Sequence, residues 1–340
     1  MPQMRAVQVG APGGDFELVT RDIPEPKENE VQIRIEACGI CHGDAIVKEG
    51  HFPGLRYPRI PGHEVVGRIS KLGAKVADHE VGQRIGVGWY GGPCLQCPPC
   101  RRGDLFNCER PLTTAISFDG GYAEYMTAPV LALNIIPDEL GPLEAAPLVC
   151  AGRTTYTALR HSGAKGCDTV AVQGIGGLGH LALQYARKLG FKTVAVSRGT
   201  SKRDLALKLG AHHYIDAESS DAGEELKKMG GARVILATAP SGKAISELVN
   251  GLGPEGRLII VAAPRDPLTL HAGQLFQGRR SVSGWTARMT KDPAESAVHF
   301  SVITGILPMI EVFPLERAAE AYERMMTSKV RFRAVLKIAE

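Results

Sequence analysis

No stretch of this chain limits its fold as strongly as the glycine-rich turn Gly174-Ile175-Gly176-Gly177-Leu178-Gly179. It follows an apolar run, Thr169–Gln173, typical of a buried strand, and precedes a stretch with helical spacing, His180–Leu189. In this setting the first glycine makes the turn, the second admits a pyrophosphate, and the third lets helix and strand pack closely. The free N–H groups of the helix N-terminus would face the phosphates. A glycine-rich turn without a ligand is the alternative interpretation.

The sequence around this turn alternates apolar runs with helical stretches. Further runs lie at Thr193–Ser197, Arg233–Ala237 and Arg257–Val261, and Lys202–Leu209 is a helical stretch between them. Strands that are apolar throughout and alternate with helices predict a parallel sheet buried on both faces. We therefore expect a Rossmann domain, a doubly wound parallel sheet, over residues 151–285.

The rest of the chain has a different pattern. Up to residue 150 it is rich in glycine and proline with short alternating runs, which predicts a mostly β domain. After residue 285 the pattern becomes helical over Pro293–Thr304 and Leu315–Thr327 and ends in a strand, Ala334–Ile338. We expect this last segment to return to the first domain, so that residues 1–150 and 286–340 form one unit.

Composition excludes several classes of function. The 340 residues include 40 basic and 36 acidic side chains, and a net charge of +4 is too small to favour a nucleic-acid partner. The N-terminus shows no signal pattern and no apolar run reaches membrane length, which predicts a cytoplasmic protein without a membrane partner. In that compartment the eight cysteines should be thiols, available for metal binding or catalysis.

Four cysteines lie close together in the segment 92–110, which is rich in proline and glycine. Cys94, Cys97, Cys100 and Cys108 have the spacing C-x2-C-x2-C-x7-C. Four thiolates complete a tetrahedral shell, so the spacing predicts a structural Zn²⁺ site. Four free surface cysteines and an iron–sulfur cluster are the alternatives.

Three further segments carry metal-binding residue types: Cys38–Asp44, Pro61–Gly67 and Val149–Gly152. None is decisive alone. Cys150 can be a small buried side chain and His63 a core histidine, and Cys38 with Cys41 can be mistaken for a redox pair. Because Cys38 ends an alternating strand, we assign it to packing.

The motif Gly62-His63-Glu64-x2-Gly67-x5-Gly73-x2-Val76, with the four-cysteine segment after it, resembles the zinc signature of the medium-chain zinc alcohol dehydrogenases. The resemblance covers nearly the whole chain and includes the bacterial and cinnamyl alcohol dehydrogenase branches. It implies a GroES-like, mostly β catalytic domain with a zinc-binding lobe, joined to the Rossmann domain.

The resemblance also implies the residues of a catalytic zinc site. Cys41, His63 and Cys150 would hold the ion, with Glu64 beside it as an alternate ligand, and Asp44 would accept a hydrogen bond from the histidine. Two thiolates and an imidazole leave a fourth position open for substrate, where zinc would activate an alcohol or an aldehyde. Zinc is not redox-active, so the electrons need an organic cofactor. We thus expect two Zn²⁺ per chain and a nicotinamide cofactor.

One departure from the family concerns proton transfer. Members usually have Ser or Thr two residues after the first cysteine ligand and often His three residues later, whereas this chain has Gly43 and Ile46. A water beside Gly43, or His42, would have to carry the proton, and the missing side chain should widen the substrate pocket. Trp89 and Tyr90 are expected to line that pocket, with plain loop packing as the alternative.

The choice of nicotinamide cofactor depends on the turn after the second strand of the Rossmann domain. NAD enzymes place a carboxylate there, whereas this chain has Ser197, Arg198, Lys202 and Arg203. We therefore favour NADP over NAD, although these cations can also simply be solvated. By resemblance, further cofactor contacts are expected from Thr154, from the main chain around Val261, and from Arg333 at the pyrophosphate.

The predicted function is reversible hydride transfer between NAD(P) and a primary alcohol or aldehyde, aromatic and long-chain compounds included. A polyol dehydrogenase, which tends to have Glu in place of Cys150, and a non-catalytic NADPH-binding protein are the alternatives. Zinc-free reductases of the same superfamily lack both metal sites. Similar bacterial enzymes form dimers or tetramers by pairing the last strand of the nucleotide domain, here Ser281–Gly284, so a homodimer or homotetramer is expected.

Overall fold

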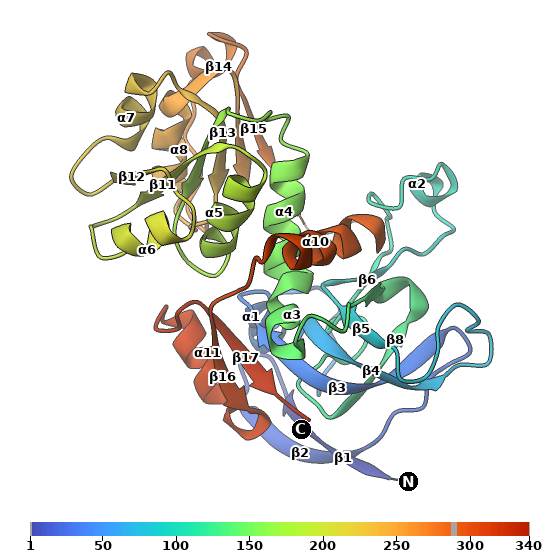
Figure 1. The fold of residues 1–340 in the computed structure, drawn as a ribbon. Helices are drawn as coiled ribbons and strands as arrows, with labels where there is room; N and C mark the ends of the chain where they lie inside the picture. The colour runs from blue at the N-terminus through green and yellow to red at the C-terminus, as the bar shows by residue number, and fades with distance from the viewer. Residues whose placement is uncertain (1, 287–290, 340) are drawn as a thin grey trace. The chain divides into compact units, whose positions relative to one another are not determined.

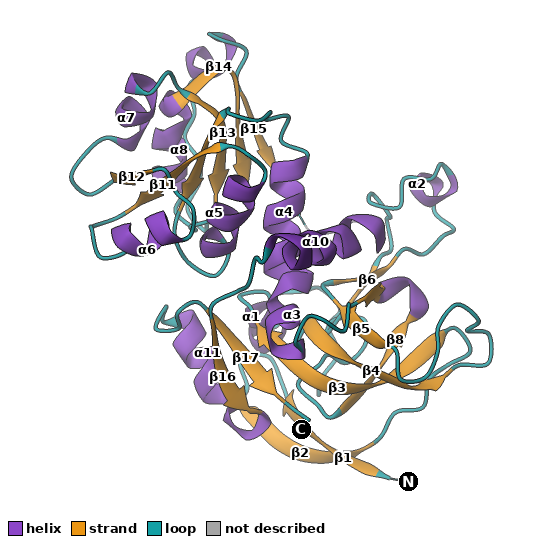
Figure 2. Cartoon of the chain, in the orientation of Figure 1, coloured by secondary structure: helices purple, strands orange, loops and turns teal. Residues whose placement is uncertain are grey.

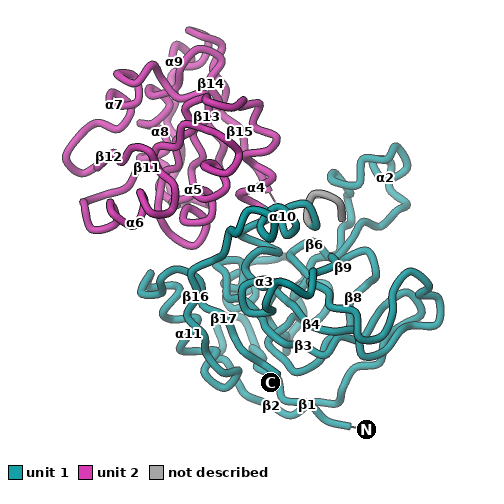
Figure 3. Tube along the Cα trace, in the orientation of Figure 1, with its two compact units in different colours: residues 1–153, 287–340 teal, residues 154–286 magenta. Residues whose placement is uncertain are grey.

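The computed structural model describes residues 2–286 and 291–339, and the chain divides into two compact units (Figures 1 and 3). Unit 1 consists of Met1–Arg153 and Ala287–Glu340, and unit 2 of Thr154–Thr286. The chain therefore leaves unit 1, builds unit 2 and returns. The boundaries expected from sequence, 150/151 and 285/286, compare with 153/154 and 286/287 in the structure.

Unit 2 is built on a six-stranded parallel sheet in the order β12-β11-β10-β13-β14-β15. Its strands are β10 (Thr169–Gln173), β11 (Lys192–Ser197), β12 (His213–Asp216), β13 (Ala232–Ala237), β14 (Leu252–Ile260) and β15 (Ser281–Gly284). This is the order of a Rossmann sheet, with the glycine turn following the first strand in sequence, β10. The predicted doubly wound parallel sheet is confirmed.

Helices cover both faces of this sheet, as Figure 2 shows. They are α4 (Arg153–Arg160), α5 (Gly179–Lys188), α6 (Arg203–Lys208), α7 (Ala222–Lys228), α8 (Gly242–Leu248) and α9 (Ala272–Phe276), with a 3₁₀ turn at Val249–Gly251. Ala171 of β10 packs in one cluster with Leu226 of α7 and Ile245 of α8. Val170 and Val172 point to the opposite face and are also fully buried. Burial on both faces explains why these strands are apolar throughout.

Unit 1 contains a seven-stranded sheet in the order β16-β17-β3-β4-β5-β9, with β8 also paired to β3, and two small two-stranded sheets, β1-β2 and β6-β7. The strands are β1 (Gln3–Val9), β2 (Phe16–Asp22), β3 (Glu30–Ile40), β4 (Glu64–Leu72), β5 (Arg84–Val87), β6 (Tyr90–Gly92), β7 (Leu112–Thr113), β8 (Tyr125–Pro129), β9 (Leu133–Ile135), β16 (Ile310–Pro314) and β17 (Arg333–Lys337). The C-terminal segment thus rejoins the first part of the chain through β17, which pairs antiparallel with β3.

The helices of unit 1 are short except α10 (Figure 2). They are α1 (Asp44–Glu49), α2 (Pro98–Arg101), α3 (Pro142–Pro147), α10 (Lys291–Thr304) and α11 (Ala318–Met326), with 3₁₀ turns at Val130–Ala132 and Leu315–Arg317 and a π-helical turn at Leu148–Gly152. Cys38 is fully buried and lies in the main apolar core of this unit, as expected for a packing residue. Among the described residues, no helix has the length and apolar character needed to cross a bilayer.

Candidate active site

Four side chains with metal-binding atoms meet in unit 1 where β3 ends and β4 begins. Cys41 follows β3, and His63 and Glu64 stand at the start of β4, which pairs antiparallel with β3 so that Gly39 lies opposite Glu64. The sulfur of Cys150 joins them at 3.5 Å from His63 Nε2. One candidate ligand atom from each of the four residues lies within 4.8 Å of the others.

Cys150 is held in a π-helical turn, Leu148–Gly152, between α3 and α4. Pro147, the last residue of α3, has no N–H to donate to a helical hydrogen bond, and the regular α-helical pattern stops there. Single π-helical turns are rare and are frequently found at functional sites. Here the turn places the sulfur of Cys150 toward the cluster while Val149 and Ala151 remain buried.

Asp44 fixes the orientation of the His63 ring. Its Oδ1 lies 2.9 Å from His63 Nδ1, and both side chains are almost completely buried. A carboxylate can only accept, so Nδ1 carries a proton, and Nε2 is the ring nitrogen that faces Cys150. Burial lowers the pKa of His63, but Asp44 and Cys41 together more than offset this, and the pKa is raised well above its usual value.

The two thiols of the cluster differ in their readiness to ionise. A hydrogen bond with Cys150 lowers the pKa of Cys41 well below its usual value, against the effect of burial and with help from His63 and Arg333. The same hydrogen bond, with burial, raises the pKa of Cys150. Cys41 is therefore the first of the pair to become a thiolate, the form that binds metal.

Glu64 is fully buried and pairs with Arg333, the first residue of β17. Burial raises the pKa of Glu64 to about 7, and the guanidinium acts against this rise. Gly39 makes room for the carboxylate, because a Cβ there would lie 2.0 Å from Glu64 Oε2. Resemblance placed Arg333 at a pyrophosphate, whereas in unit 1 it is 5% exposed and bonded to Glu64.

A second cluster consists of the four cysteines in the loop between β6 and β7. Cys97 Sγ lies 3.4 Å from Cys100 Sγ and 3.9 Å from Cys108 Sγ, and the N–H of Cys94 donates to Cys108 Sγ. Zn–S bonds of about 2.3 Å in a tetrahedron separate sulfurs by about 3.8 Å. N–H groups of Gln96 and Cys97 lower the pKa of Cys94 to about 6. The spacing of the sulfurs fits a closed zinc site.

The donor set at Cys41, His63 and Cys150 also fits Zn²⁺, but as an open site. It offers two sulfurs and one imidazole nitrogen, and its carboxylate is occupied by Arg333. Three protein ligands leave one position for a further oxygen, which is the arrangement of catalytic zinc.

The expected widening of the pocket at Gly43 is not found, and this corrects the sequence-based argument. A Cβ at Gly43 would lie 2.7 Å from His63 Cε1 and 3.2 Å from Trp89 Cζ3, so two rings already fill that space. The Trp89 ring stands edge-on to His63, with centroids 4.8 Å apart, and packs with Ile46 in a small apolar cluster. His42 is exposed. Glycine here accommodates the tryptophan rather than enlarging the cavity.

Tyr90, which was expected to line the substrate pocket, packs against the loop that carries the four cysteines. It is buried, and its hydroxyl donates to the carbonyl of Leu105 in the loop that carries the four cysteines. Its side chain therefore supports that loop, whereas Trp89 contacts the histidine of the open cluster.

The glycine turn in unit 2 has the geometry that its three roles require. Gly174 has φ +89°, and α5 begins at Gly179. A Cβ at Gly179 would lie 1.8 Å from Gly174 O, whereas one at Gly176 would meet no atom within 4 Å. The third glycine thus permits close packing, and the second leaves space for an approaching group. Ile175, Gly177 and Leu178 complete the turn, and Lys202 Nζ donates to the carbonyl of Ile175.

The turn after β11 is held by groups from β12. Asp216 accepts hydrogen bonds from the N–H groups of Gly199 and Glu218, and these donors keep its pKa below the usual range. Ser197 is half-buried, and Arg198 and Arg203 are exposed.

Two other expected cofactor residues lie elsewhere in unit 2. Thr154 is buried in the first turn of α4, where its carbonyl accepts from the hydroxyl of Thr157. Val261 follows β14, and its N–H donates to Ala237 O.

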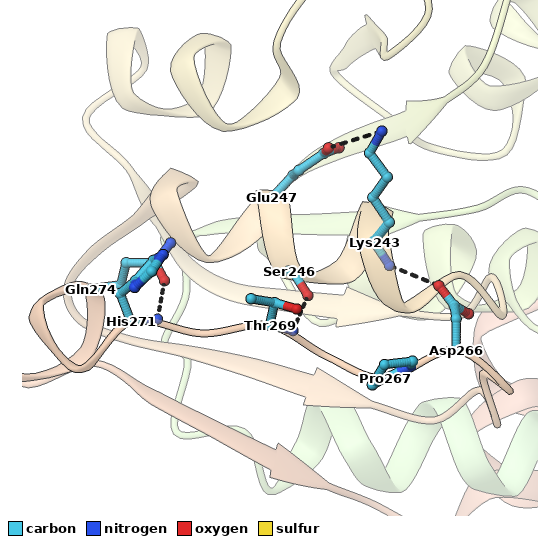
Figure 4. A pocket seen from close by; sticks show the side chains of 8 residues that line it. All are labelled: Lys243, Ser246, Glu247, Asp266, Pro267, Thr269, His271 and Gln274. Atoms are coloured by element: carbon cyan, nitrogen blue, oxygen red, sulfur yellow. Dashed lines mark hydrogen bonds and ion pairs between the residues drawn. The ribbon is translucent and has the colours of Figure 1, made fainter.

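A separate hollow of about 460 Å³ lies beside α8 (Figure 4). Many of its polar groups bond to one another. The pairs are Lys243 N–H with Asp266, Thr269 N–H with Ser246, and His271 N–H with Gln274. None of the site residues predicted from sequence lines this hollow.

Sequence reasoning missed two buried polar residues near the open cluster. Tyr122 donates its hydroxyl to Asp44, and no local motif signals this contact across 78 residues. Arg153 is 3% exposed and close enough to Cys150 for the two charges to interact, and burial lowers its pKa to about 10. A cation directly after the apolar segment Leu148–Gly152 was the signal available for Arg153.

Comparison with known proteins agrees with this geometry. A family described as "Alcohol dehydrogenase GroES-like domain" matches residues 27–138, and one described as "Zinc-binding dehydrogenase" matches residues 177–301. An alcohol dehydrogenase of an Aspergillus species is 42% identical over 321 residues, covering 94% of both chains. The predicted combination of a GroES-like domain with a Rossmann domain is confirmed.

Two solved structures resemble the whole chain. A cinnamyl alcohol dehydrogenase of Sorghum bicolor has a TM-score of 0.89 at 27% identity, covering 99% of this chain and 98% of the other. A CAD from Helicobacter pylori, complexed with NADP(H), has a TM-score of 0.87 at 25% identity, covering 98% of both. The non-catalytic and polyol alternatives are not favoured. By its two matched domains, its relatives and its cysteine–histidine clusters, the chain belongs to the medium-chain zinc-containing alcohol dehydrogenase family, a family of oxidoreductases that act on alcohols.

Proposed function

We propose that this alcohol dehydrogenase holds two Zn²⁺ per chain and uses NADP(H) to interconvert primary alcohols, aromatic and long-chain ones included, and aldehydes. The observation that carries the proposal is the convergence of Cys41, His63 and Cys150, with the histidine orientation set by Asp44. The cinnamyl alcohol dehydrogenase among the similar structures supports aromatic substrates.

The chain's own residues have distinct roles at this site. Cys41, His63 and Cys150 would hold the catalytic ion, with Glu64 as an alternate ligand, and the four cysteines of the loop would hold the structural ion. A bound Zn²⁺ supplies Lewis acidity toward an alcohol or carbonyl oxygen. Asp44 keeps the proton on His63 Nδ1, so that Nε2 remains free to bind.

Proton transfer is expected to differ from that of relatives with a hydroxyl side chain at the position of Gly43. The wall formed by Ile46 and Trp89 offers neither a hydroxyl nor a base. The rings of His63 and Trp89 stand where a side chain at Gly43 would begin, so we assign the exit of the proton to His42, which is exposed and next to Cys41.

The preference for NADP is supported by charge at the turn after β11. Arg198 and Arg203 are exposed there, while the nearby carboxylate of Asp216 is already engaged by two backbone N–H groups. Two guanidinium groups are suited to a 2′-phosphate. The relative from Helicobacter pylori was solved with NADP(H).

The edge strand of the unit 2 sheet bears on assembly, and the state of the cysteines bears on the location of the protein. β15 is the last strand of the unit 2 sheet, and within residues 2–286 and 291–339 it pairs only with β14, so its other edge can pair with a second copy. We therefore propose a homodimer or homotetramer. None of the eight cysteines forms a disulfide, which fits the reducing cytoplasm that we propose as the protein's location.

The proposal is tested by metal analysis and a cofactor-by-alcohol activity panel on the same samples. Wild-type protein should contain two Zn²⁺ and prefer NADP(H), and Cys150→Ser should lose one ion and turnover. Cys167→Ser, at an exposed cysteine outside both clusters, is the matched control and should behave as wild type. Wild-type protein with fewer than two ions, or an active Cys150→Ser with both, would contradict the zinc assignment.

A further inference from the structure

Tyr122 contacts Asp44 beside the open cluster, and the proposed function gives it no role. Its ring is completely buried in unit 1, beside Phe16. Its hydroxyl lies 2.9 Å from Asp44 Oδ2 and donates a hydrogen bond to it.

The hydroxyl completes the set of donors around one buried carboxylate. Asp44 Oδ1 faces His63 Nδ1, while Oδ2 accepts from the N–H of Cys41 and from Tyr122, each at 2.9 Å. Asp44 has no exposed surface, so solvent cannot replace a lost donor. A buried carboxylate that loses a donor shifts toward its remaining partners, and such a shift disturbs the hydrogen bond between Asp44 and His63.

The backbone around Tyr122 prevents the ring from swinging away. Its N–H donates to Pro61 O and its carbonyl accepts from the N–H of Val7. Gly62, which precedes His63, has φ +99°, and a Cβ there would lie 2.5 Å from Tyr122 Cδ1. The tyrosine and the histidine are therefore positioned by the same short segment.

We propose that Tyr122 is a positioning residue for the metal ion: it fixes Asp44, and Asp44 fixes the imidazole of His63. The inference rests on the zinc site proposed above. It predicts that the hydroxyl of Tyr122 increases the affinity of the catalytic site for Zn²⁺ without touching the ion.

The test compares Tyr122→Phe with Tyr322→Phe. Both remove one hydroxyl from a buried ring, but the hydroxyl of Tyr322 has no hydrogen-bond partner among the described residues. Zinc affinity is measured by competition with a chromogenic chelator, and Cys150→Ser identifies the ion that belongs to the catalytic site. Direct partners of metal-bound histidines change affinity by about 10–100-fold. One step further away, Tyr122→Phe should lower it about three- to tenfold, and Tyr322→Phe should leave it unchanged.

Cobalt substitution provides a readout that a purely structural role would not alter. With Co²⁺ in the catalytic site, Tyr122→Phe should shift the d–d absorption bands, and Tyr322→Phe should not. In Asp44→Asn protein, adding Tyr122→Phe should cost no further zinc affinity. Unchanged affinity and bands in Tyr122→Phe would overturn the positioning role, as would loss of folding in Tyr122→Phe alone, which would show that the hydroxyl serves the core. Wild-type protein without zinc outside the four-cysteine loop would refute the metal site itself.

Discussion

Replacing Gly43 by alanine tests how tightly the rings of His63 and Trp89 fill the site. Gly43 has φ −60° and ψ −27°, which alanine adopts without strain, so any cost is steric. The new Cβ would lie 2.7 Å from His63 Cε1 and 3.2 Å from Trp89 Cζ3. Trp89 is half-buried and can move, but His63 is 1% exposed and tied to Asp44 through Nδ1.

The size of the effect follows from two opposing contributions. Inserting a carbon into a packed site costs about 1–3 kcal/mol. Replacing glycine by alanine at a compatible backbone position stabilises by about 0.4–1 kcal/mol through the unfolded state. We expect Gly43→Ala to lower the free energy of unfolding by about 1–2 kcal/mol. Because the displaced atoms belong to a proposed ligand, zinc affinity of the catalytic site should fall about 10–100-fold.

Urea unfolding and chelator competition measure the two quantities on the same protein. Gly166→Ala is the matched control, since a Cβ at this exposed glycine would meet no atom within 4 Å. It should be unchanged or slightly more stable. If Gly43→Ala matched Gly166→Ala in stability and kept wild-type zinc affinity, the site would have room at Gly43 and the steric reasoning would be refuted.

Three further predictions concern other parts of the chain. Cys97→Ser should remove one of two Zn²⁺ ions and lower Tm, because Leu105 is the one apolar side chain besides the cysteines in that cluster among the described residues. Full thermal stability by calorimetry would contradict a structural ion. Arg198→Asp should weaken NADPH binding by about 1–3 kcal/mol in fluorescence titration and affect NADH less, while a tenfold preference of wild type for NADH would argue against the charge assignment. The N–H groups of Glu218 and Gly199 hold the pKa of Asp216 in the folded protein below its value of about 3.9 in the unfolded chain. The Asp216 carboxylate therefore stabilises the fold above the unfolded pKa, and this stabilisation is lost as the pH falls through the folded-state pKa. The Tm difference between wild type and Asp216→Asn should therefore be constant from about pH 5 to 8 and should shrink below about pH 4. A Tm difference that grows in acid would contradict this assignment.

Patterns confined to a few residues were predictable from sequence. The turn Gly174–Gly179 and its flanking strand and helix occur as expected, because each glycine role depends on neighbours within one βα unit. The same holds for the loop with four cysteines, whose sulfurs gather within a short segment.

Contacts between distant segments were not predictable. The partner of Arg333 is Glu64, and the space at Gly43 is filled by Trp89, because sheet pairing and ring packing decide these contacts rather than local spacing. The π-helical turn at Cys150 has no sequence signature beyond Pro147. Resemblance named candidate ligands, but only three-dimensional packing shows which side chains surround them.

The pairing of Glu64 with Arg333 has a consequence for the order in which the protein is made. The two residues are 269 positions apart, so at about 5–20 residues per second a ribosome needs roughly 13–54 s to progress from one to the other. Throughout that interval all of unit 2 emerges, and the nascent chain carries an acidic group without its cation. The loop of four cysteines can load its ion early, from one short stretch of translated chain. The open site reaches its finished electrostatics only when β17 has been synthesised and pairs with β3.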